Sequence, residues 1–173
     1  HFLRACIPSR VHKDLFSFIN VARNPIAVRS SSLLEDSHYQ PFAGIYSTYM
    51  VPNLHENEHQ MLEILGQAIK CVYASVYYKE SKAYMQATQN VIDEERMAIV
   101  LQEVVGTAYG DKFYPTFSGV ARSLNFYPIE PEKPSDGIAS VALGLGKHVV
   151  DGRPSLRFSP KYPTTENNTP QEQ

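Results

Sequence analysis

The sequence predicts an α+β fold with a mostly antiparallel sheet flanked by helices. Apolar residues at helical spacing alternate along the chain with short strand patterns, in the order α-β-β-α-α-β-β-α-β. This order is typical of an α+β layer structure. Hydrophobic residues make up 43% of the 173 residues and aromatic residues 11%, which is enough for a packed core and argues against general disorder.

Four elements are expected in the first third of the chain. Residues 11–21 carry apolar side chains at the spacing of a short amphipathic helix, which Asn24-Pro25 ends. Residues 26–29 form an apolar run that predicts a buried strand. Residues 30–41 are rich in turn formers and predict a loop, whereas residues 42–51 alternate in the manner of a second strand.

The strongest helical pattern covers residues 57–78. Asn57 can cap its N-terminus, because Gln60 follows three residues later, and apolar residues from Met61 to Val76 fall on one stripe. A second helix is expected over residues 81–89.

The second half of the chain begins with a nearly continuous apolar run, residues 96–105, which predicts a buried strand. Residues 117–126 predict another strand, interrupted at Gly119. Residues 138–150 are rich in small and apolar side chains and are expected to form the last helix of the order given above. Residues 156–158 are expected to form an edge strand.

Composition excludes several classes of protein. A net charge of -2 argues against a nucleic-acid interface, and no apolar run approaches the roughly 20 residues of a membrane span. Two cysteines are too few for a disulfide scaffold and favour a reducing, cytoplasmic location. Residues 164–173 are polar and predict a flexible tail. The absence of an initiator Met leads us to expect a piece of a longer polypeptide.

The most informative stretch follows the strand at residues 26–29. Arg29 ends the apolar run, Ser30 and two further serines come next, and Gly44 and Thr48 lie shortly downstream. A guanidinium offers bidentate donors to phosphate oxygens, hydroxyls add donors, and glycine lets backbone N–H groups come close. This combination is typical of a pocket for a polyphosphate.

The same stretch carries a family resemblance. Val28-Arg29-Ser30-Ser31, Glu35-Asp36 and Phe42-Ala43-Gly44-x3-Thr48 resemble, in order, a pattern of the N-terminal nucleotide-binding domain of phosphoenolpyruvate synthase and pyruvate phosphate dikinase, an ATP-grasp relative. The resemblance implies that Arg29, Gly44 and Thr48 contact the phosphates of ATP, with Ser30 and Ser31 as helpers. Arg29 would also act catalytically by offsetting charge that develops on the phosphates.

A second block, Ile99 to Val105, resembles the strand and hinge that hold adenine in this family. By resemblance, Gln102 makes a polar contact on the adenine side, and Glu103 and Val104 belong to the hinge. Taken without the resemblance, the same residues describe a buried strand with polar residues at its end.

Other positions depart from the family. Arg122 stands where an aromatic residue is usual, and Lys147 replaces the glutamate of a glycine-rich block at residues 144–152. Glu35 and Asp36 have carboxylates suited to a metal, but a solvated loop is the favoured interpretation. No metal ligand is assigned to any residue of this chain. His55 and His59 are at helical spacing without a third ligand nearby.

The resemblance implies the function as well as the fold. Residues 1–163 would form the central part of an ATP-grasp-like nucleotide-binding domain, in an enzyme that binds ATP with Mg²⁺. The phosphoryl group would pass to a histidine on a mobile domain and then to pyruvate, giving phosphoenolpyruvate. The piece alone is expected to be inactive.

Two alternatives stay open. A chain with Lys147 and the altered stretch after Gly119 is also compatible with a non-catalytic regulatory or interaction module that kept the fold. An unrelated small α+β binding domain is the remaining interpretation. ATP and, through other domains, pyruvate or phosphoenolpyruvate are the expected partners, with neither nucleic acid nor membrane among them.

Overall fold

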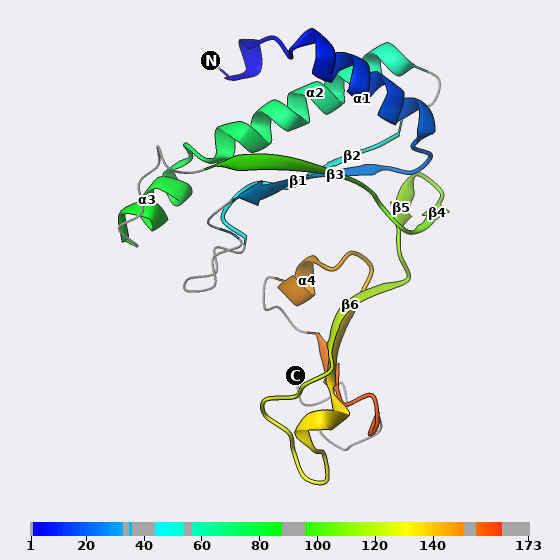
Figure 1. The fold of residues 1–173 in the computed structure, drawn as a ribbon. Helices are drawn as coiled ribbons and strands as arrows, with labels where there is room; N and C mark the ends of the chain where they lie inside the picture. The colour runs from blue at the N-terminus through cyan, green and yellow to red at the C-terminus, as the bar shows by residue number, and fades with distance from the viewer. Residues whose placement is uncertain are drawn as a thin grey trace. The chain divides into compact units, whose positions relative to one another are not determined.

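The computed structural model describes residues 2–32, 35, 44–53, 57–87, 96–150 and 155–163, apart from the side chains of His148 and Val150. The chain divides into two compact units, His1–Val104 (unit 1) and Val105–Gln173 (unit 2) (Figure 1). Each unit is described by itself. The expected tail at residues 164–173 lies outside the described residues and stays a prediction.

Unit 1 is built on a three-stranded antiparallel sheet of order β2-β1-β3. The central strand β1, Ile26–Ser32, pairs along its whole length with β3, Met97–Glu103. The short edge strand β2, Tyr49–Val51, pairs with the first residues of β1, so that Val28 faces Tyr49.

Helices cover one face of this sheet (Figure 1). The helices of unit 1 are α1 (Ser9–Val21), α2 (Glu58–Ser75) and α3 (Lys79–Ala87), with a 3₁₀ turn, η1 (Phe2–Arg4), at the start. The main core forms between α1, α2 and the covered face of the sheet. Its fully buried members include Ile26, Val28, Met61, Leu65 and Val72.

The sequence predicts the start of α2 correctly. The side chain of Asn57 accepts a hydrogen bond from the Gln60 backbone N–H at 3.0 Å. This bond satisfies one of the donors that a helix N-terminus leaves unpaired.

Unit 2 contains two small antiparallel sheets. β4 (Thr107–Tyr109) and β5 (Lys112–Tyr114) form a hairpin, and β6 (Phe117–Arg122), β7 (Ile138–Leu143) and β8 (Leu156–Phe158) form a sheet of that order. A short helix, α4 (Lys147–Val150), follows β7, and a 3₁₀ turn, η3 (Pro134–Asp136), precedes it.

The α+β fold and the antiparallel pairing are confirmed, because every strand pair of the described residues is antiparallel. Three expectations in unit 1 are wrong. Residues 30–32 continue β1 instead of forming a loop, since β3 supplies a partner for each of them. Of the strand expected at residues 42–51, only Tyr49–Val51 forms within the described part. β3 is not buried on both faces, because helices cover only one.

Further differences concern unit 2. Gly119 does not interrupt β6, which pairs continuously with β7. Residues 138–143 are a strand and not a helix, because β6 and β8 flank them on both sides. The β4–β5 hairpin had no counterpart among the expected elements. Residues 42–43 and 88–89 of the expected strand and helix lie outside the described residues.

Candidate functional site

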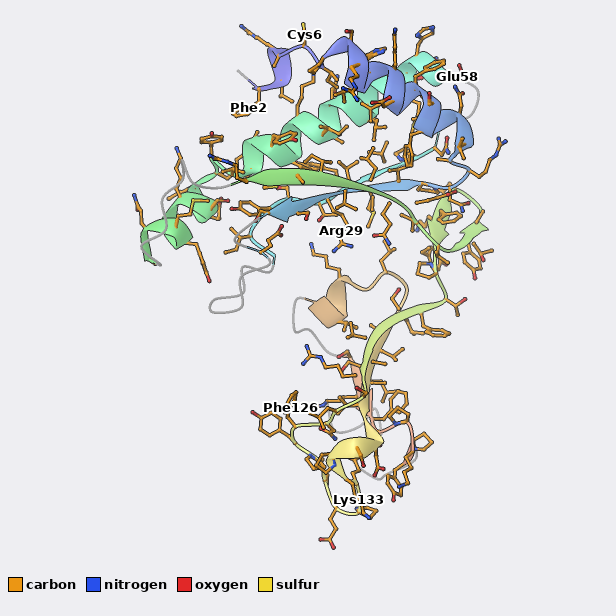
Figure 2. The ribbon with its side chains drawn as sticks, viewed as in Figure 1. Phe2, Cys6, Arg29, Glu58, Phe126 and Lys133 are labelled. Carbon is orange, nitrogen blue, oxygen red and sulfur yellow. The ribbon has the colours of Figure 1, made fainter. Side chains whose placement is uncertain are left out.

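The face of the β2-β1-β3 sheet that α1 and α2 leave uncovered, here called the open face, carries the central candidate residue. Side chains alternate between the two faces of a strand. Val28 of β1 lies in the core, so Arg29 lies on the open face, and it is exposed. Figure 2 shows the Arg29 side chain leaving the sheet on the side away from α1 and α2.

Two candidate residues meet on this face. Arg29 Nη1 donates a hydrogen bond to Gln102 Oε1 at 3.1 Å. The register explains the contact, because Arg29 faces Val100 of β3 and Gln102 is two residues further on the same face. The bond uses one of the five donors of the guanidinium and leaves the others to a ligand.

Thr48 directly precedes β2 at the edge of the sheet. The strand pairing ends where Val28 faces Tyr49, and Thr48 is the residue that continues this register toward Arg29. Thr48 is exposed. Gly44 is also exposed and has a backbone φ of +84°, a left-handed conformation that favours glycine.

Ser30 lies on the other face from Arg29. Its Oγ donates to Glu35 Oε1 at 2.9 Å, and Glu35 Oε2 accepts the Ser32 backbone N–H at 3.2 Å. The structure therefore does not bring Ser30 and Arg29 together, and Glu35 closes the turn after β1. Of the two helper serines, Ser31 is the one on the face of Arg29.

Glu103 and Val104 hold the start of β1 in place. Glu103 Oε1 accepts the backbone N–H groups of Arg23 at 2.9 Å and Asn24 at 2.7 Å. These bonds hold the pKa of Glu103 below its ordinary value, and the bond from Arg23 has the larger effect. The Val104 N–H donates to the Pro25 carbonyl at 2.8 Å. Both groups are thus engaged in the fold. Gln102 and Glu103 are both exposed, and of the two, Gln102 is the one that hydrogen-bonds to Arg29.

Sequence reasoning missed the residues that hold the segment between Gly44 and Thr48. The Ser47 N–H donates to the Oγ of Ser75, at the end of α2, and Tyr46 is buried against Val76 and Met85. A hydroxyl in the otherwise apolar last turn of a helix is the one sequence feature that could have pointed to Ser75.

In unit 2, Arg122 and Lys147 are exposed. Arg122 ends β6, and Lys147 begins α4. Among the described residues, neither side chain has a hydrogen-bond or ion-pair partner that would explain its departure from the family pattern.

No group of three or more potential ligands suited to a metal ion occurs among the described residues. None of the helices in the described part has the length and apolar character needed to cross a membrane. Cys6 and Cys71 are free thiols, and a cytoplasmic location stays a prediction.

The sequence as a whole matches one family model, described as the AMP/ATP-binding domain of pyruvate phosphate dikinase, over residues 1–171. The chain belongs to this family. The membership confirms the resemblance drawn from the Arg29 and Gln102 blocks.

Two relatives support the assignment. An uncharacterized phosphotransferase of Bacillus subtilis (strain 168), YvkC, is 33% identical over 127 residues, which cover 73% of this chain and 13% of the relative. A phosphoenolpyruvate synthase of Aeropyrum pernix is 28% identical over 152 residues, 88% of this chain and 16% of the relative. The chain thus spans a small part of the length of both.

Proposed function

We propose that the open face of the β2-β1-β3 sheet binds the phosphates of ATP, as the ATP-binding part of a phosphotransferase of the phosphoenolpyruvate synthase and pyruvate phosphate dikinase type. One observation carries the proposal. In a chain of an AMP/ATP-binding family, an arginine stands exposed on an uncovered sheet face, oriented by the amide of Gln102.

The position of each candidate residue suggests its role in binding ATP. The Arg29 guanidinium would take phosphate oxygens as a bidentate donor and offset the charge that develops during transfer. Thr48, which continues the β1–β2 register toward Arg29, would add a hydroxyl donor, and the backbone at Gly44 would approach the phosphates. Gln102 would contact the adenine, since it lies next to Glu103, the last residue of β3, and to Val104 beyond it.

Magnesium enters as part of the nucleotide, which is Mg-ATP in solution. The described residues provide no set of carboxylates for a resident ion. Glu35 accepts hydrogen bonds from Ser30 and Ser32, and Asp36 lies outside the described residues. We assign no metal ligand among the described residues.

For the whole protein we propose that one phosphoryl group passes from ATP to a histidine on another, mobile domain and from there to pyruvate, while the second is transferred to water, so that AMP, phosphoenolpyruvate and phosphate are the products. The part played by this chain is positioning and charge neutralisation, which dominate catalysis of phosphoryl transfer. The chain alone is expected to bind nucleotide weakly and to transfer nothing.

Calorimetric titration of the full-length protein with Mg-ATP tests the proposal. Arg29→Ala should weaken binding about five- to 150-fold, equivalent to about 1–3 kcal/mol for a lost charge-assisted contact. Arg10→Ala, which removes the same charge from an exposed position of α1, is the matched control and should bind as the wild type does. Equal affinities in all three proteins would refute the assignment of Arg29.

A second candidate function, a non-catalytic interaction module, is favoured by one feature of unit 2. The loop between β6 and β7 exposes Leu124, Phe126, Tyr127 and Ile129, and Phe126 is labelled in Figure 2. The loop is well fixed, because Asn125 is fully buried and its Nδ2 donates to Glu132 Oε2 at 3.1 Å. Exposed apolar residues on a fixed loop are typical of contact surfaces. A full-length protein that binds no Mg-ATP would favour this function.

A further inference from the structure

The segment that carries Gly44 and Thr48 is attached to the sheet at one end only. At its C-terminal end, Tyr49 pairs with Val28 of β1. Residues 44–48 have no strand partner in the described part of the chain. Within the described residues, the position of Thr48 therefore depends on contacts made by the residues on either side of it.

The last residue of α2 and the residues between it and α3, positions 75–78, supply these contacts, and we call them the α2–α3 junction. Ser75 Oγ donates its single proton to the Val72 carbonyl at 2.6 Å. Its lone pairs are then free to accept, and they take the Ser47 N–H at 3.2 Å. Ser75 is fully buried, and the bond to Ser47 is partly buried.

Two further contacts join the junction to neighbouring residues of the segment. The Tyr46 side chain is buried in a small cluster with Val76 and Met85. Tyr78 hydrogen-bonds with Tyr49, and this bond is the main reason why the pKa of Tyr78 is raised above its ordinary value. The junction thus contacts residues 46, 47 and 49, on both sides of Thr48.

Ser81 lies in α3, and among the described residues its hydroxyl makes no hydrogen bond to the segment. Its Oγ donates to the Ser75 backbone carbonyl at 2.6 Å, and the same carbonyl also accepts the Tyr78 N–H at 3.2 Å. Ser81 is also fully buried. Ser75 and Ser81 are therefore two hydroxyls of equal burial, of which Ser75 is the one that hydrogen-bonds to the segment.

We propose that the α2–α3 junction, through Ser75, positions the Gly44–Thr48 segment for the phosphates of the nucleotide. The inference rests on the proposed function, and it adds Ser75 as a positioning residue that acts through the Ser47 backbone. Losing the Ser75 acceptor lowers the fraction of molecules whose segment is in place, and apparent affinity falls by the same factor.

The test compares Ser75→Ala with the matched control Ser81→Ala in the full-length protein, with Mg-ATP and adenosine as probes. Ser75→Ala should raise the Kd for Mg-ATP about tenfold. This is the change expected if the segment is correctly positioned in only about a tenth of the variant molecules. The Kd for adenosine, which lacks phosphates, should change less than about twofold. Ser81→Ala should leave both affinities within about twofold, although both variants lose a buried hydrogen bond and some stability.

Each other outcome overturns the inference. If Arg29→Ala weakens Mg-ATP binding and Ser75→Ala does not, the proposed function stands and the positioning role is wrong. If Ser75→Ala and Ser81→Ala weaken Mg-ATP and adenosine alike, the serines are merely structural. If the wild type binds no Mg-ATP, the proposed function fails and the inference fails with it.

Hydrogen exchange of the wild-type protein keeps the inference testable if Ser75→Ala does not fold. The Ser47 amide should exchange at least about tenfold more slowly than an unprotected amide, because a buried acceptor holds it. A Ser47 amide that exchanges at the rate of a free peptide would overturn the positioning role.

Discussion

At Gly44 the backbone conformation decides which side chains the position accepts. Its φ is +84°, and no atom of the described residues lies within 4 Å of the place where a Cβ would stand. Space is therefore available, and the cost of a substitution comes from the backbone alone. The glycine therefore allows the left-handed backbone conformation through which the chain continues toward Thr48.

Gly44→Ala should lower the free energy of unfolding by about 1–2 kcal/mol, the cost of a left-handed residue with a Cβ. Gly44→Asn should cost less, because asparagine adopts this conformation more readily than alanine. Urea denaturation of the wild type and both variants measures the difference. Equal stability of Gly44→Ala and the wild type would contradict the conformational argument.

The Glu103 carboxylate makes unit 1 sensitive to acid. Its folded-state pKa is lowered by the Arg23 and Asn24 N–H groups, so its contribution to stability is present above the ordinary glutamate pKa. That contribution is lost as the pH falls through the lowered pKa, because the protonated acid accepts these bonds less well.

Glu103→Ala should therefore lower the melting temperature at neutral pH, and the gap from the wild type should shrink in acid. Glu63→Ala, which removes an exposed carboxylate from α2, is the control and should show a smaller gap at neutral pH. Thermal melts across the acid range provide the measurement. A gap for Glu103→Ala that does not depend on pH would contradict the role of the charged form.

At the scale of elements, the sequence predicts what depends on local pattern and misses what depends on partners. The α2 helix and its Asn57 cap follow from apolar spacing and a capping residue, both local. The length of β1 does not, because Ser30 to Ser32 are strand only through pairing with β3. Residues 138–143 are likewise apolar enough for a helix and become a strand between β6 and β8.

The candidate site shows the same division. Two different motifs of the sequence identify Arg29 and Gln102. The contact between them follows from a strand register that the sequence does not reveal. Ser30 was grouped with Arg29 because it is adjacent in sequence, although alternation along a strand turns it to the other face. Ser75 had no motif, because its role depends on a contact across 28 positions of the chain.

Within unit 2, an ion pair holds the end of the β6–β7 loop. Lys161 Nζ lies 2.9 Å from Asp136 Oδ1, and Asp136 Oδ2 accepts the Lys133 N–H at 2.8 Å. The hydrogen bond from Lys161, followed by that from Lys133, lowers the pKa of Asp136, and Asp136 raises the pKa of Lys161. The pair therefore stabilises the fold above the ordinary aspartate pKa and below the ordinary lysine pKa.

Lys161→Ala should speed hydrogen exchange in β7 and in the loop before it at neutral pH, and the effect should fade in acid as Asp136 is protonated. Lys112→Ala removes a lysine from the exposed hairpin strand β5 and is the control. An effect that stays constant down to strongly acidic pH would show that the ion pair does not hold the loop.

At the scale of the whole chain, the two units differ in the interactions that stabilise each of them internally. Both apolar core clusters of the described residues belong to unit 1. In unit 2, Ala139 alone among the described apolar side chains is buried, and strand pairing provides most of the order. Apolar burial is the dominant stabilising term in folding.

Hydrogen exchange of the full-length protein should therefore show the strongest protection in β1 and β3 and weaker protection in β6 and β7, because segments with few buried contacts open at lower free energy. The comparison uses backbone amides of the same residue type that donate hydrogen bonds between strands in each of the two sheets. Equal protection in both sheets would mean that unit 2 is stabilised by contacts beyond those within it.

The most direct test of the account is to locate the nucleotide on the protein by amide chemical-shift changes on titration with Mg-ATP. If ATP binds the open face, the largest saturable changes should occur in unit 1 at Arg29, Thr48 and Gln102, with small changes along α1 on the covered side of the sheet. Arg29→Ala should abolish them at the same nucleotide concentration. Saturable changes that leave the open face untouched would contradict the assignment.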